Sequence, residues 1–373
     1  MGSTIILILL NHESDGLSHT NNKKILEMQF MGIITLKCIL ADFEKAGPQA
    51  KAVSIVLEQL SLAAAAVAAA VADGASNARF SEEGATNVQG EVQKYLDVFA
   101  HNAFLDAAQK APIACLLSEE EDLPVELLAG GTLALAIDPL DGSSNIGVNS
   151  TIGTIFGIYP AVEGEISQNF LRSGRDLIAA GYFIYGARTE LVVSLGATPL
   201  VFALDVARVN WCFVREGIIP KSAFEFAINM SNYRFWSERE RRFVDQCLDG
   251  KEGPLAVDYN MRWLAALAGE THRIFARGGI FFYPADQRKG YERGRLRYIY
   301  ECAPIAYLVE KAGGVANDGA TDILDLMPTS LHGRCPLCFG SMAQMQLFAE
   351  AKVSSERQYS PLFSKRGFFR NGA

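Results

Sequence analysis

IDPLDGSSN, at residues 137–145, is the stretch on which the rest of the chain depends. The residues before it, 132–137, are apolar and partly β-branched, which predicts a buried strand. Pro139 is expected to stop that strand, and the Gly-Ser-Ser-Asn run favours a turn or the start of a helix. Asp138 and Asp141 should therefore reach the end of a strand together. Two converging carboxylates suit a hard divalent cation, and the small residues beyond them let backbone amides approach a phosphate.

A polar turn that caps a helix is the simpler interpretation of the same stretch. It would account for one aspartate, a glycine and a serine. It would not account for a second aspartate three residues away, next to so apolar a strand. We therefore favour a site for a metal and a phosphate group.

The composition narrows the class of protein. The chain has 373 residues, of which 49% are hydrophobic, and a formal net charge of −8. This length predicts two domains with ample cores. The acidic balance argues against a nucleic-acid partner, which needs a basic face, and fits an enzyme that concentrates cations around an anionic substrate. The seven cysteines are scattered and odd in number, which favours a reducing cytoplasm over a disulfide framework.

Cys335 and Cys338 form a C-x-x-C pair close to His332, a combination that can bind zinc. No second pair completes a structural zinc site, and the surrounding residues are typical of a strand. We therefore expect both cysteines to be buried thiols.

The chain divides into four predicted parts. Residues 1–30 predict an N-terminal extension, whose apolar run at residues 5–10 is too short to span a bilayer and follows no positive region. A series of strands between residues 151 and 214 ends around residues 217–222, which we interpret as a domain boundary. The predicted organisation is an extension at 1–30, domains at 31–217 and 218–350, and a C-terminal tail at 351–373.

Other acidic residues also follow predicted strands. The run SEEED at residues 118–122 comes after an apolar strand at 114–117, and Glu301 ends a predicted strand at 295–300. Pro304 then lies in the first turn of a helix. A solvated loop and a helix cap are the ordinary alternatives for these acidic positions. Carboxylates at the ends of neighbouring strands can instead share a metal at one edge of a sheet.

Glu91 and Asp97 are two further candidate carboxylates, and they follow a segment without hydrophobic periodicity. Residues 73–90 are rich in Gly, Ser and Asn and predict a loop, which leads into Glu91 and an amphipathic helix that carries Asp97. On an ordinary helix both would be solvated charges, unless the tertiary fold brings them to the metal. Farther along, residues 263–269 predict a helix and residues 286–294 a basic loop that contains glycine.

With these residues assembled, the sequence resembles the class I fructose-1,6-bisphosphatases, particularly the bacterial forms, from about Thr35 to about Ser341. The Asp-Pro-Leu-Asp-Gly motif is shared with inositol monophosphatase relatives. The Ser-Ser-Asn run after it, and Glu301 where those relatives have Trp-Asp, favour the bisphosphatase branch. Further matching segments are TNVQGE at residues 86–91, LDV at 96–98, SEE at 118–120, IGTIFGIY at 152–159, GIF at 279–281, YPA at 283–285, YEC at 300–302 and EKAGG at 310–314.

The resemblance implies an α/β fold, the layered α/β/α/β/α sandwich of the sugar phosphatase type that fructose-1,6-bisphosphatase and inositol monophosphatase share. It implies an N-terminal metal-binding domain, a C-terminal sugar-phosphate-binding domain and a homotetramer built from dimers. The implied cofactor is Mg²⁺, two to three ions per subunit, with Mn²⁺ as an alternative, since all the implied ligands are oxygens. These ligands are Glu119, Asp138, the Leu140 carbonyl, Asp141, Glu301 and, for an additional ion, Glu91.

The resemblance also implies the catalytic and substrate-binding residues. Glu120 with Asp97 would orient and deprotonate the attacking water. The 1-phosphate would be held by Asp141, Gly142, Ser143 and Ser144. The distal phosphate and the sugar would be bound by Asn229, Tyr283 and Arg295, with Arg262 reaching in from the neighbouring subunit. The register around residues 229–233 leaves Asn232 or Tyr233 open in place of Asn229.

Several positions depart from the family pattern. Arg295 stands where many relatives have lysine, and Trp263 replaces a tyrosine of the animal enzymes. Ala266-Leu267 replace the usual Ser-Met that lines the sugar pocket. The segments nearest to the AMP site of the animal enzymes, at residues 46–50 and 132–133, also differ, so AMP inhibition is not expected.

The implied function is Mg²⁺-dependent hydrolysis of the 1-phosphate of fructose 1,6-bisphosphate, which yields fructose 6-phosphate and phosphate in gluconeogenesis or the Calvin cycle. Sedoheptulose-1,7-bisphosphatase activity, alone or alongside, is the alternative, because both substrates present a ketose 1-phosphate and a distal phosphate. A catalytically dead protein that holds metal and senses sugar phosphates is a remote alternative, because the acidic set is complete. The implied location is the cytoplasm, with no nucleic-acid or membrane partner.

Overall fold

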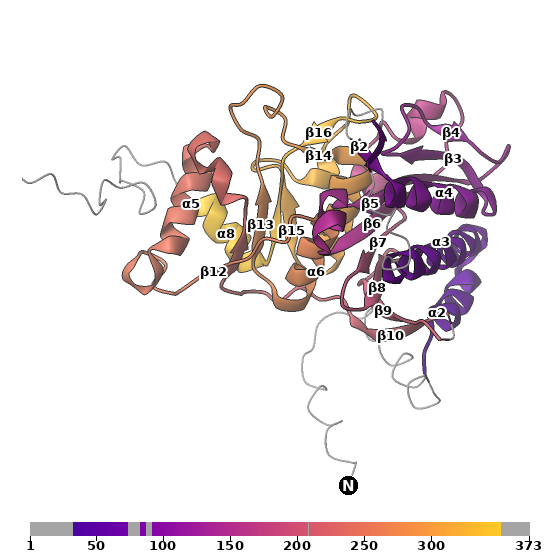
Figure 1. Cartoon of the computed structure of the whole chain (residues 1–373), viewed down its shortest axis with the longest axis horizontal. Helices are drawn as coiled ribbons and strands as arrows, with labels where there is room; N and C mark the ends of the chain where they lie inside the picture. Colours follow the sequence, from indigo (N-terminus) through magenta and orange to yellow (C-terminus); the bar gives the residue numbers. More distant parts are fainter. Residues whose placement is uncertain (1–32, 74–82, 87–91, 208, 352–373) are drawn as a thin grey trace, which may run out of the picture.

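The computed structural model describes residues 33–73, 83–86, 92–207 and 209–351. Within this part of the chain, two β-sheets alternate with three layers of helices (Figure 1). Three hydrophobic cores hold the layers together, one on each outer face and one between the two sheets. The fold is therefore the α/β/α/β/α sandwich expected from the sequence.

The larger sheet has eight strands in the order β10-β9-β8-β7-β6-β5-β3-β4. Within this sheet β3 and β5 pair in parallel, and the other neighbours are antiparallel. Its central strands are buried almost throughout, because helices cover both faces. The bounds are β3 (Ile113–Ser118), β4 (Val125–Glu126), β5 (Leu133–Asp141), β6 (Ile152–Pro160), β7 (Ala179–Tyr185), β8 (Thr189–Ser194), β9 (Leu200–Asp205) and β10 (Asn210–Glu216).

Helices α2 (Leu36–Phe43), α3 (Pro48–Ala72) and α4 (Tyr95–Gln109) cover the outer face of this sheet (Figure 1). By length and composition alone, α3 could cross a membrane. One side of it instead packs against α4 and the sheet, where small residues such as Ala64 allow close approach. Before α4, β1 (Glu83–Thr86) pairs with β2 (Val92–Lys94), so the loop predicted over residues 73–90 contains a short strand.

The smaller sheet has the order β12-β11-β13-β17-β15. Helices α5 (Glu238–Leu248) and α8 (Met342–Glu350) cover its outer face. Helices α6 (Leu267–Arg277) and α7 (Ala303–Lys311) form the layer between the two sheets. The strands are β11 (Glu225–Ala227), β12 (Asn260–Met261), β13 (Ile280–Tyr283), β15 (Val315–Asn317) and β17 (Leu337–Gly340), with a separate pair of β14 (Leu296–Arg297) and β16 (Arg334–Cys335).

Strand β5 does not stop at Pro139, so that prediction is wrong. The strand continues to Asp141 through an irregular step, because Asp138 pairs with Ile155 and Asp141 pairs with Gly153. Residues three apart on a regular strand point to opposite faces, whereas residues two apart share a face. The extra residue in β5 is a bulge, which brings Asp138 and Asp141 to the same face of the sheet.

Helix α6 begins at Leu267, four residues after the predicted start at 263, and continues to Arg277. The reason lies in two alanines just before it. Ala265 has a left-handed backbone, with φ of 58°, and Ala266 is extended. Neither conformation can continue a helix, so the chain turns here before α6 starts.

The strand predicted at residues 295–300 is also shorter than expected. It covers only Leu296–Arg297, and η8 (Tyr298–Cys302) then forms a turn of π-helix that leads into α7. The Glu301 carboxylate accepts the backbone amide of Arg297 at 2.5 Å, which closes this wide turn. Single π-turns are frequent at functional sites because they re-aim one side chain.

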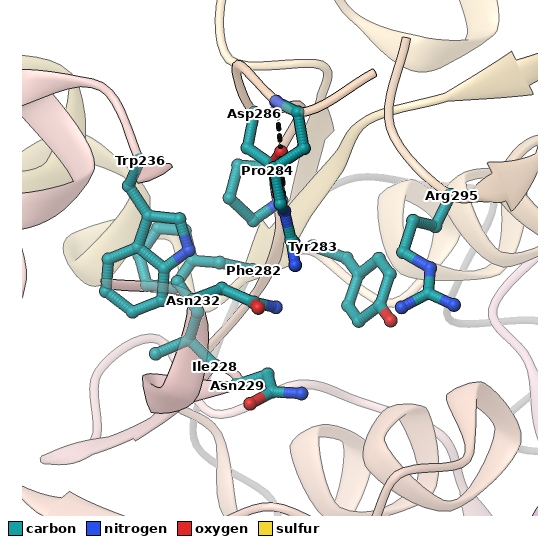
Figure 2. Close-up of a pocket in the computed structure, with 10 residues that line it drawn as sticks. Ile228, Asn229, Asn232, Trp236, Phe282, Tyr283, Pro284, Asp286 and Arg295 are labelled. Atoms are coloured by element: carbon teal, nitrogen blue, oxygen red, sulfur yellow. Dashed lines mark hydrogen bonds and ion pairs between the residues drawn. The ribbon is translucent and has the colours of Figure 1, made fainter. Parts of the chain in front are cut away.

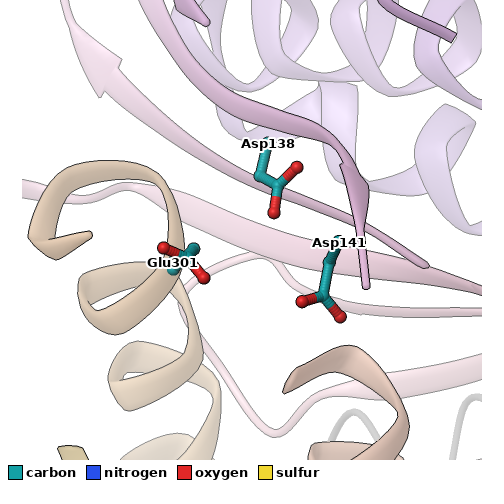
Figure 3. Close-up of side chains that lie close together, drawn as sticks. All are labelled: Asp138, Asp141 and Glu301. Atoms are coloured by element: carbon teal, nitrogen blue, oxygen red, sulfur yellow. The ribbon is translucent and has the colours of Figure 1, made fainter. Parts of the chain in front are cut away.

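Two groups of polar side chains result from this arrangement. One lines a pocket beside β13 (Figure 2), and the other gathers at the end of β5 (Figure 3).

Candidate metal and phosphate site

Three carboxylates converge where β5 meets η8: Asp138, Asp141 and Glu301 (Figure 3). One oxygen atom from each lies within 4.8 Å of the others. All three residues are buried, with exposed fractions of 3%, 7% and 7%. Among the described residues, these are the acidic, histidine or cysteine side chains that lie close enough together to hold a metal ion.

Burial is the largest cause that raises the pKa of each of these carboxyl groups. The pKa of Asp138 is raised further by the negative charges of Glu119, Asp141 and Glu301. The pKa of Glu301 is raised next by Glu119. Burial raises the pKa of Asp141 to about 6, and two backbone amides at the start of α6 donate to its carboxylate and partly oppose this rise.

This donor set fits a divalent cation. Buried like charges within the reach of one ion are unfavourable unless protons or a cation neutralise them. All the donors are carboxylate oxygens, which suit hard ions such as Mg²⁺ and Mn²⁺ better than zinc. Asp138, Asp141 and Glu301 would be the residues that hold the ion.

Glu119 joins this group from the end of β3. Its backbone amide donates to the carbonyl of Ile137 at 3.1 Å, one residue before Asp138. The charge of Glu119 also contributes to the raised pKa values of Asp138 and Glu301. Glu120, the next residue, is half-buried, and its amide donates to the Ser118 hydroxyl at 3.3 Å. Glu119 therefore lies near the carboxylate group, whereas Asp122, at the end of the acidic run, is exposed. The role of Glu120 stays a prediction.

Asp97 is buried in the first turn of α4, with an exposed fraction of 4%. His101 lies one turn later on the same helix face, and two contacts join it to the acidic run. Its Nδ1 is 3.1 Å from the Ser118 hydroxyl, and its Nε2 is 3.2 Å from a Glu121 carboxylate oxygen. His101 thus fixes the start of α4 against the segment that carries Glu120. The sequence signal for His101 is its spacing of four from Asp97, which places both on one helix face.

Two of the implied metal ligands are less directly placed. Leu140 lies in the bulge, and its amide donates to Asp138 Oδ1 at 3.0 Å. The ligand role of the Leu140 carbonyl stays a prediction. Glu91 lies outside the described residues.

A tight turn follows Asp141 directly. Gly142 has a left-handed φ of 78°, and a Cβ added there would lie 2.6 Å from the Cβ of Ala266, so only glycine fits. Helix η3 (Ser143–Val148) starts next, with Ser143 half-buried and Ser144 exposed. The two serines therefore follow the carboxylate group directly in the chain, at the start of η3. Their role in phosphate binding stays a prediction.

The second group of side chains lines the pocket beside β13 (Figure 2). Figure 2 shows the Tyr283 hydroxyl and the Arg295 guanidinium side by side, with the amides of Asn229 and Asn232 across from them. Tyr233 is not in this pocket, because its hydroxyl donates to the Asp245 carboxylate at 2.8 Å. The lining residues are Ile228, Asn229, Asn232, Trp236, Phe282, Tyr283, Pro284, Asp286, Arg288 and Arg295.

Arg288 is a pocket residue that the sequence reasoning missed. Asp286 holds its guanidinium through Nε, at 3.0 and 3.1 Å from the two carboxylate oxygens, and through Nη2. The guanidinium also lies over the ring of Tyr291, with its central carbon 4.4 Å from the ring centroid, and Arg295 lies over the same ring at 4.7 Å. One tyrosine ring thus orients two cations. The basic composition of residues 286–294 was the available signal.

Arg262 does not line the pocket of its own chain. Its side chain is 46% exposed, and its Nε is 3.9 Å from a Glu225 carboxylate oxygen. The expectation that it acts in a neighbouring subunit stays a prediction. Trp263, the next residue, stacks parallel to Tyr283, with the ring centroids 5.9 Å apart. The tryptophan at this position therefore packs its ring against a pocket residue.

The cysteine pair is buried, as expected, with Cys335 and Cys338 each 4% exposed. The Cys335 thiol donates to the Pro336 carbonyl at 3.1 Å, and the Cys338 sulfur is 3.6 Å from that of Met345. His332 contacts neither cysteine among the described interactions, because its ring nitrogens face the Tyr300 hydroxyl and the Asp122 carbonyl.

Comparison with known proteins agrees with this geometry. Residues 34–216 match the family model of the N-terminal domain of fructose-1-6-bisphosphatase, and residues 219–352 match that of its C-terminal domain. The chain is 47% identical over 346 residues to a class 1 fructose-1,6-bisphosphatase of Rhizobium meliloti, which covers 90% of this chain and 99% of that protein. It is 48% identical over 318 residues to one from a Bradyrhizobium species, which covers 85% and 93%.

A solved structure shows the same fold. The crystal structure of Leishmania major fructose-1,6-bisphosphatase in holo form superposes with a TM-score of 0.79 and 27% sequence identity. The match covers 86% of this chain and 99% of the other.

Proposed function

Because the chain belongs to the class 1 fructose-1,6-bisphosphatase family, a family of phosphatases, we propose that it hydrolyses the 1-phosphate of fructose 1,6-bisphosphate with Mg²⁺. The products would be fructose 6-phosphate and inorganic phosphate, in gluconeogenesis or the Calvin cycle. The observation that carries this proposal is the buried group of Asp138, Asp141 and Glu301, whose charges call for a cation. Two to three ions per subunit, held also by Glu119, the Leu140 carbonyl and Glu91, complete the proposed site.

The reacting phosphate needs positive charge around it. A bound divalent cation supplies this charge, lowers the pKa of a coordinated water and stabilises the leaving oxygen. The chain's own part is to hold and orient the reactants. Gly142, Ser143 and Ser144 would donate to the 1-phosphate oxygens, and Glu120 with Asp97 would accept the proton of the attacking water. His101 supports this pair through its contacts with Ser118 and Glu121.

The distal phosphate would act as a handle for orientation. Arg295 and Arg288 offer two cations on one side of the pocket, and Asn229 and Tyr283 offer neutral donors. Burial raises the pKa of Tyr283, which keeps its hydroxyl protonated and able to donate. Contacts so far from the reacting bond hold the sugar in place and lower the barrier to the chemical step.

Removing a pocket cation should mainly weaken substrate binding. We expect Arg295→Ala to raise KM for fructose 1,6-bisphosphate by about 10- to 100-fold, the worth of one charged hydrogen bond to phosphate, with a smaller fall in kcat. Arg288→Ala should act in the same direction. Arg293→Ala is the matched control, since Arg293 is exposed in the same loop and does not line the pocket. An Arg295 variant with the KM of wild type would contradict this role.

Sedoheptulose 1,7-bisphosphate is the alternative substrate, because it presents the same ketose 1-phosphate and a distal phosphate. Phosphate release from both sugars, measured with Mg²⁺, with Mn²⁺ and after chelation, separates the two activities. We expect higher kcat/KM for fructose 1,6-bisphosphate. Higher kcat/KM for the seven-carbon sugar would replace the proposed substrate. No release from either sugar would favour the catalytically dead sensor.

We also propose the remaining features of the family for this chain. These are a homotetramer in the cytoplasm, a metal-binding domain at residues 31–217 and a sugar-phosphate-binding domain at 218–350, with an extension at 1–30 and a tail at 351–373. Arg262 is exposed and does not line the pocket of its own chain, so a contact between Arg262 and substrate would need a neighbouring subunit of the proposed tetramer. Loss of the affinity for distal phosphate in an Arg262→Ala variant would support this contact.

A further inference from the structure

Residues 262–266 join β12 to α6 and lie between the two ends of the proposed substrate site. At one end, Trp263 stacks on the pocket residue Tyr283 at 5.9 Å. The other end is the turn at Gly142, which we call the 1-phosphate turn. Ala266 packs closely against it, because a Cβ added to Gly142 would lie 2.6 Å from the Cβ of Ala266. A shift of this segment would therefore change the spacing between the distal pocket and the 1-phosphate turn.

Hydrogen bonds hold the middle of the segment from both sides. The Leu264 amide donates to Glu270 Oε1 at 2.5 Å, and the Leu264 carbonyl accepts from Asn145 Nδ2 at 2.9 Å. Asn145 belongs to the helix that carries Ser143 and Ser144, and it also donates to the Thr151 carbonyl at 2.9 Å. The segment is thus bonded directly to the phosphate-binding side of the molecule.

The backbone of this segment needs that support. Ala265 has a φ of 58°, a left-handed conformation that alanine rarely adopts without help from its surroundings. The bonds to its neighbour Leu264 supply that help. Residues held in such conformations cluster at functional sites, where the fold fixes them.

Glu270 is itself firmly anchored. It is fully buried, and its second oxygen accepts from Arg273 Nε at 3.0 Å. Arg273 in turn donates from Nη1 to a Glu225 carboxylate oxygen at 2.9 Å. Glu225 lies on β11, in the sheet that forms the distal pocket. A buried charge network thus runs from that sheet through Glu270 to Leu264.

We propose that Glu270 is a positioning residue that sets the spacing between the distal phosphate pocket and the 1-phosphate turn, and thereby the selectivity for sugar bisphosphates. This proposal rests on the proposed function. Both phosphates of a bisphosphate can be bound at once only if the two sites are the right distance apart, and a small misplacement removes the gain from orientation. A ligand with one phosphate has no such requirement at its other end.

Glu270→Gln is the test variant. It keeps the side-chain volume and one oxygen for Leu264, but its amide nitrogen cannot accept from Arg273. We expect KM for fructose 1,6-bisphosphate to rise by about tenfold, with kcat within about threefold of wild type. Kd for fructose 6-phosphate should stay within about twofold of wild type, because this ligand has one phosphate and does not depend on the spacing. The Mg²⁺ concentration at half-activation should not change, because Glu270 touches none of the proposed metal ligands.

Glu190→Gln is the matched control. Glu190 is also a buried carboxylate that contacts α6, because His272 Nε2 lies 3.2 Å from it, but among the described interactions none joins it to residues 262–266. Its variant should stay within about twofold of wild type in KM. If thermal unfolding shows that Glu270→Gln has lost its fold, Arg273→Lys gives the same readout, since it removes the planar fork behind Glu270.

Several outcomes would overturn the proposal. One is a fall in kcat with KM unchanged, and another is a Glu270 variant that behaves like the Glu190 control. A third is a Kd for fructose 6-phosphate that rises as much as KM for fructose 1,6-bisphosphate, which would indicate a merely structural role. Absence of phosphate release by the wild-type enzyme would overturn the proposed function instead. The Kd of the variants for fructose 1,6-bisphosphate, compared with their Kd for fructose 6-phosphate, would then decide the role of Glu270 without turnover.

Discussion

An Asp138→Asn variant should lose at least about a thousandfold in kcat, a barrier increase of about 4 kcal/mol, and yet keep its fold. Asparagine has the volume of aspartate and an oxygen that can still accept the Leu140 amide, which lies 3.0 Å from Asp138 Oδ1. It lacks the negative charge that helps to hold the proposed cation. Steady-state phosphate release from fructose 1,6-bisphosphate at saturating Mg²⁺ measures the effect.

The same substitution should leave the melting temperature of the metal-free protein unchanged or raise it. Burial and the charges of Glu119, Asp141 and Glu301 all disfavour the ionised form of Asp138, so its removal relieves repulsion. Asp325→Asn is the matched control for activity, because Asp325 forms an exposed ion pair with Arg175 at 2.7 Å and is not among the charges that raise the pKa values of Asp138 and Glu301. More than about a tenth of wild-type turnover, a loss below about 1.4 kcal/mol, would show that Asp138 is not a metal ligand.

Chelation of divalent cations should abolish activity, and it should also destabilise the protein in a manner that depends on pH. A carboxyl group whose pKa is raised on folding contributes most to stability when it is protonated. For Asp141 the pKa rises from 3.8 to about 6, so the metal-free protein should lose stability as the pH rises through this range. Asp138 and Glu301 act in the same direction.

A bound cation reverses this trend, because it favours the ionised carboxylates. At a hundredfold excess over Kd, Mg²⁺ should stabilise the fold by about 2.7 kcal/mol, which corresponds to a few degrees in Tm. The difference in Tm between Mg²⁺ and chelator should therefore be small at pH 5 and larger at pH 8. Thermal unfolding at both pH values measures it, and an equal difference at the two pH values would contradict the shared metal site.

The apolar strands that lead to the acidic residues could be predicted from the sequence, although not where each one ends, because their existence depends on local pattern. The apolar run before Asp138, and the apolar run before Glu119, both form buried strands of the larger sheet. The helix after Glu301 also begins near the predicted residue, since Pro304 lies in its first turn. These features need only hydrophobic periodicity and the backbone preferences of proline.

The details that assemble the site could not be predicted in this way, because they depend on contacts between distant residues. Helix α6 starts at Leu267, where the Asp141 carboxylate accepts the amides of Leu267 and Ala268 at 3.1 and 2.7 Å, from more than a hundred residues away. Ala265 has no sequence preference for its left-handed backbone, which the surrounding contacts impose. The intrinsic conformational propensities of the residues predict neither the start of α6 nor the backbone of Ala265.

The residues that line the distal pocket could not be predicted from the sequence either. Residues 286–294 contain several cations, and their composition does not tell which of them line a pocket. Arg288 does so because Asp286 and the ring of Tyr291 orient its guanidinium. The wide turn at Glu301 is similar, since the backbone amide of Arg297 donates to the Glu301 carboxylate where the turn starts.

The bulge in β5 gives Pro139 a purpose other than ending a strand. Two adjacent strands can slide past each other by one residue, and such a slip sends every side chain to the opposite face. Proline has no amide hydrogen, so the regular pairing that would compete with the bulge lacks a donor at this point. We therefore expect Pro139 to disfavour a register shifted by one residue, in which the sheet would be complete but Asp138 and Asp141 would lie on opposite faces. The cost is one hydrogen bond of the β-ladder.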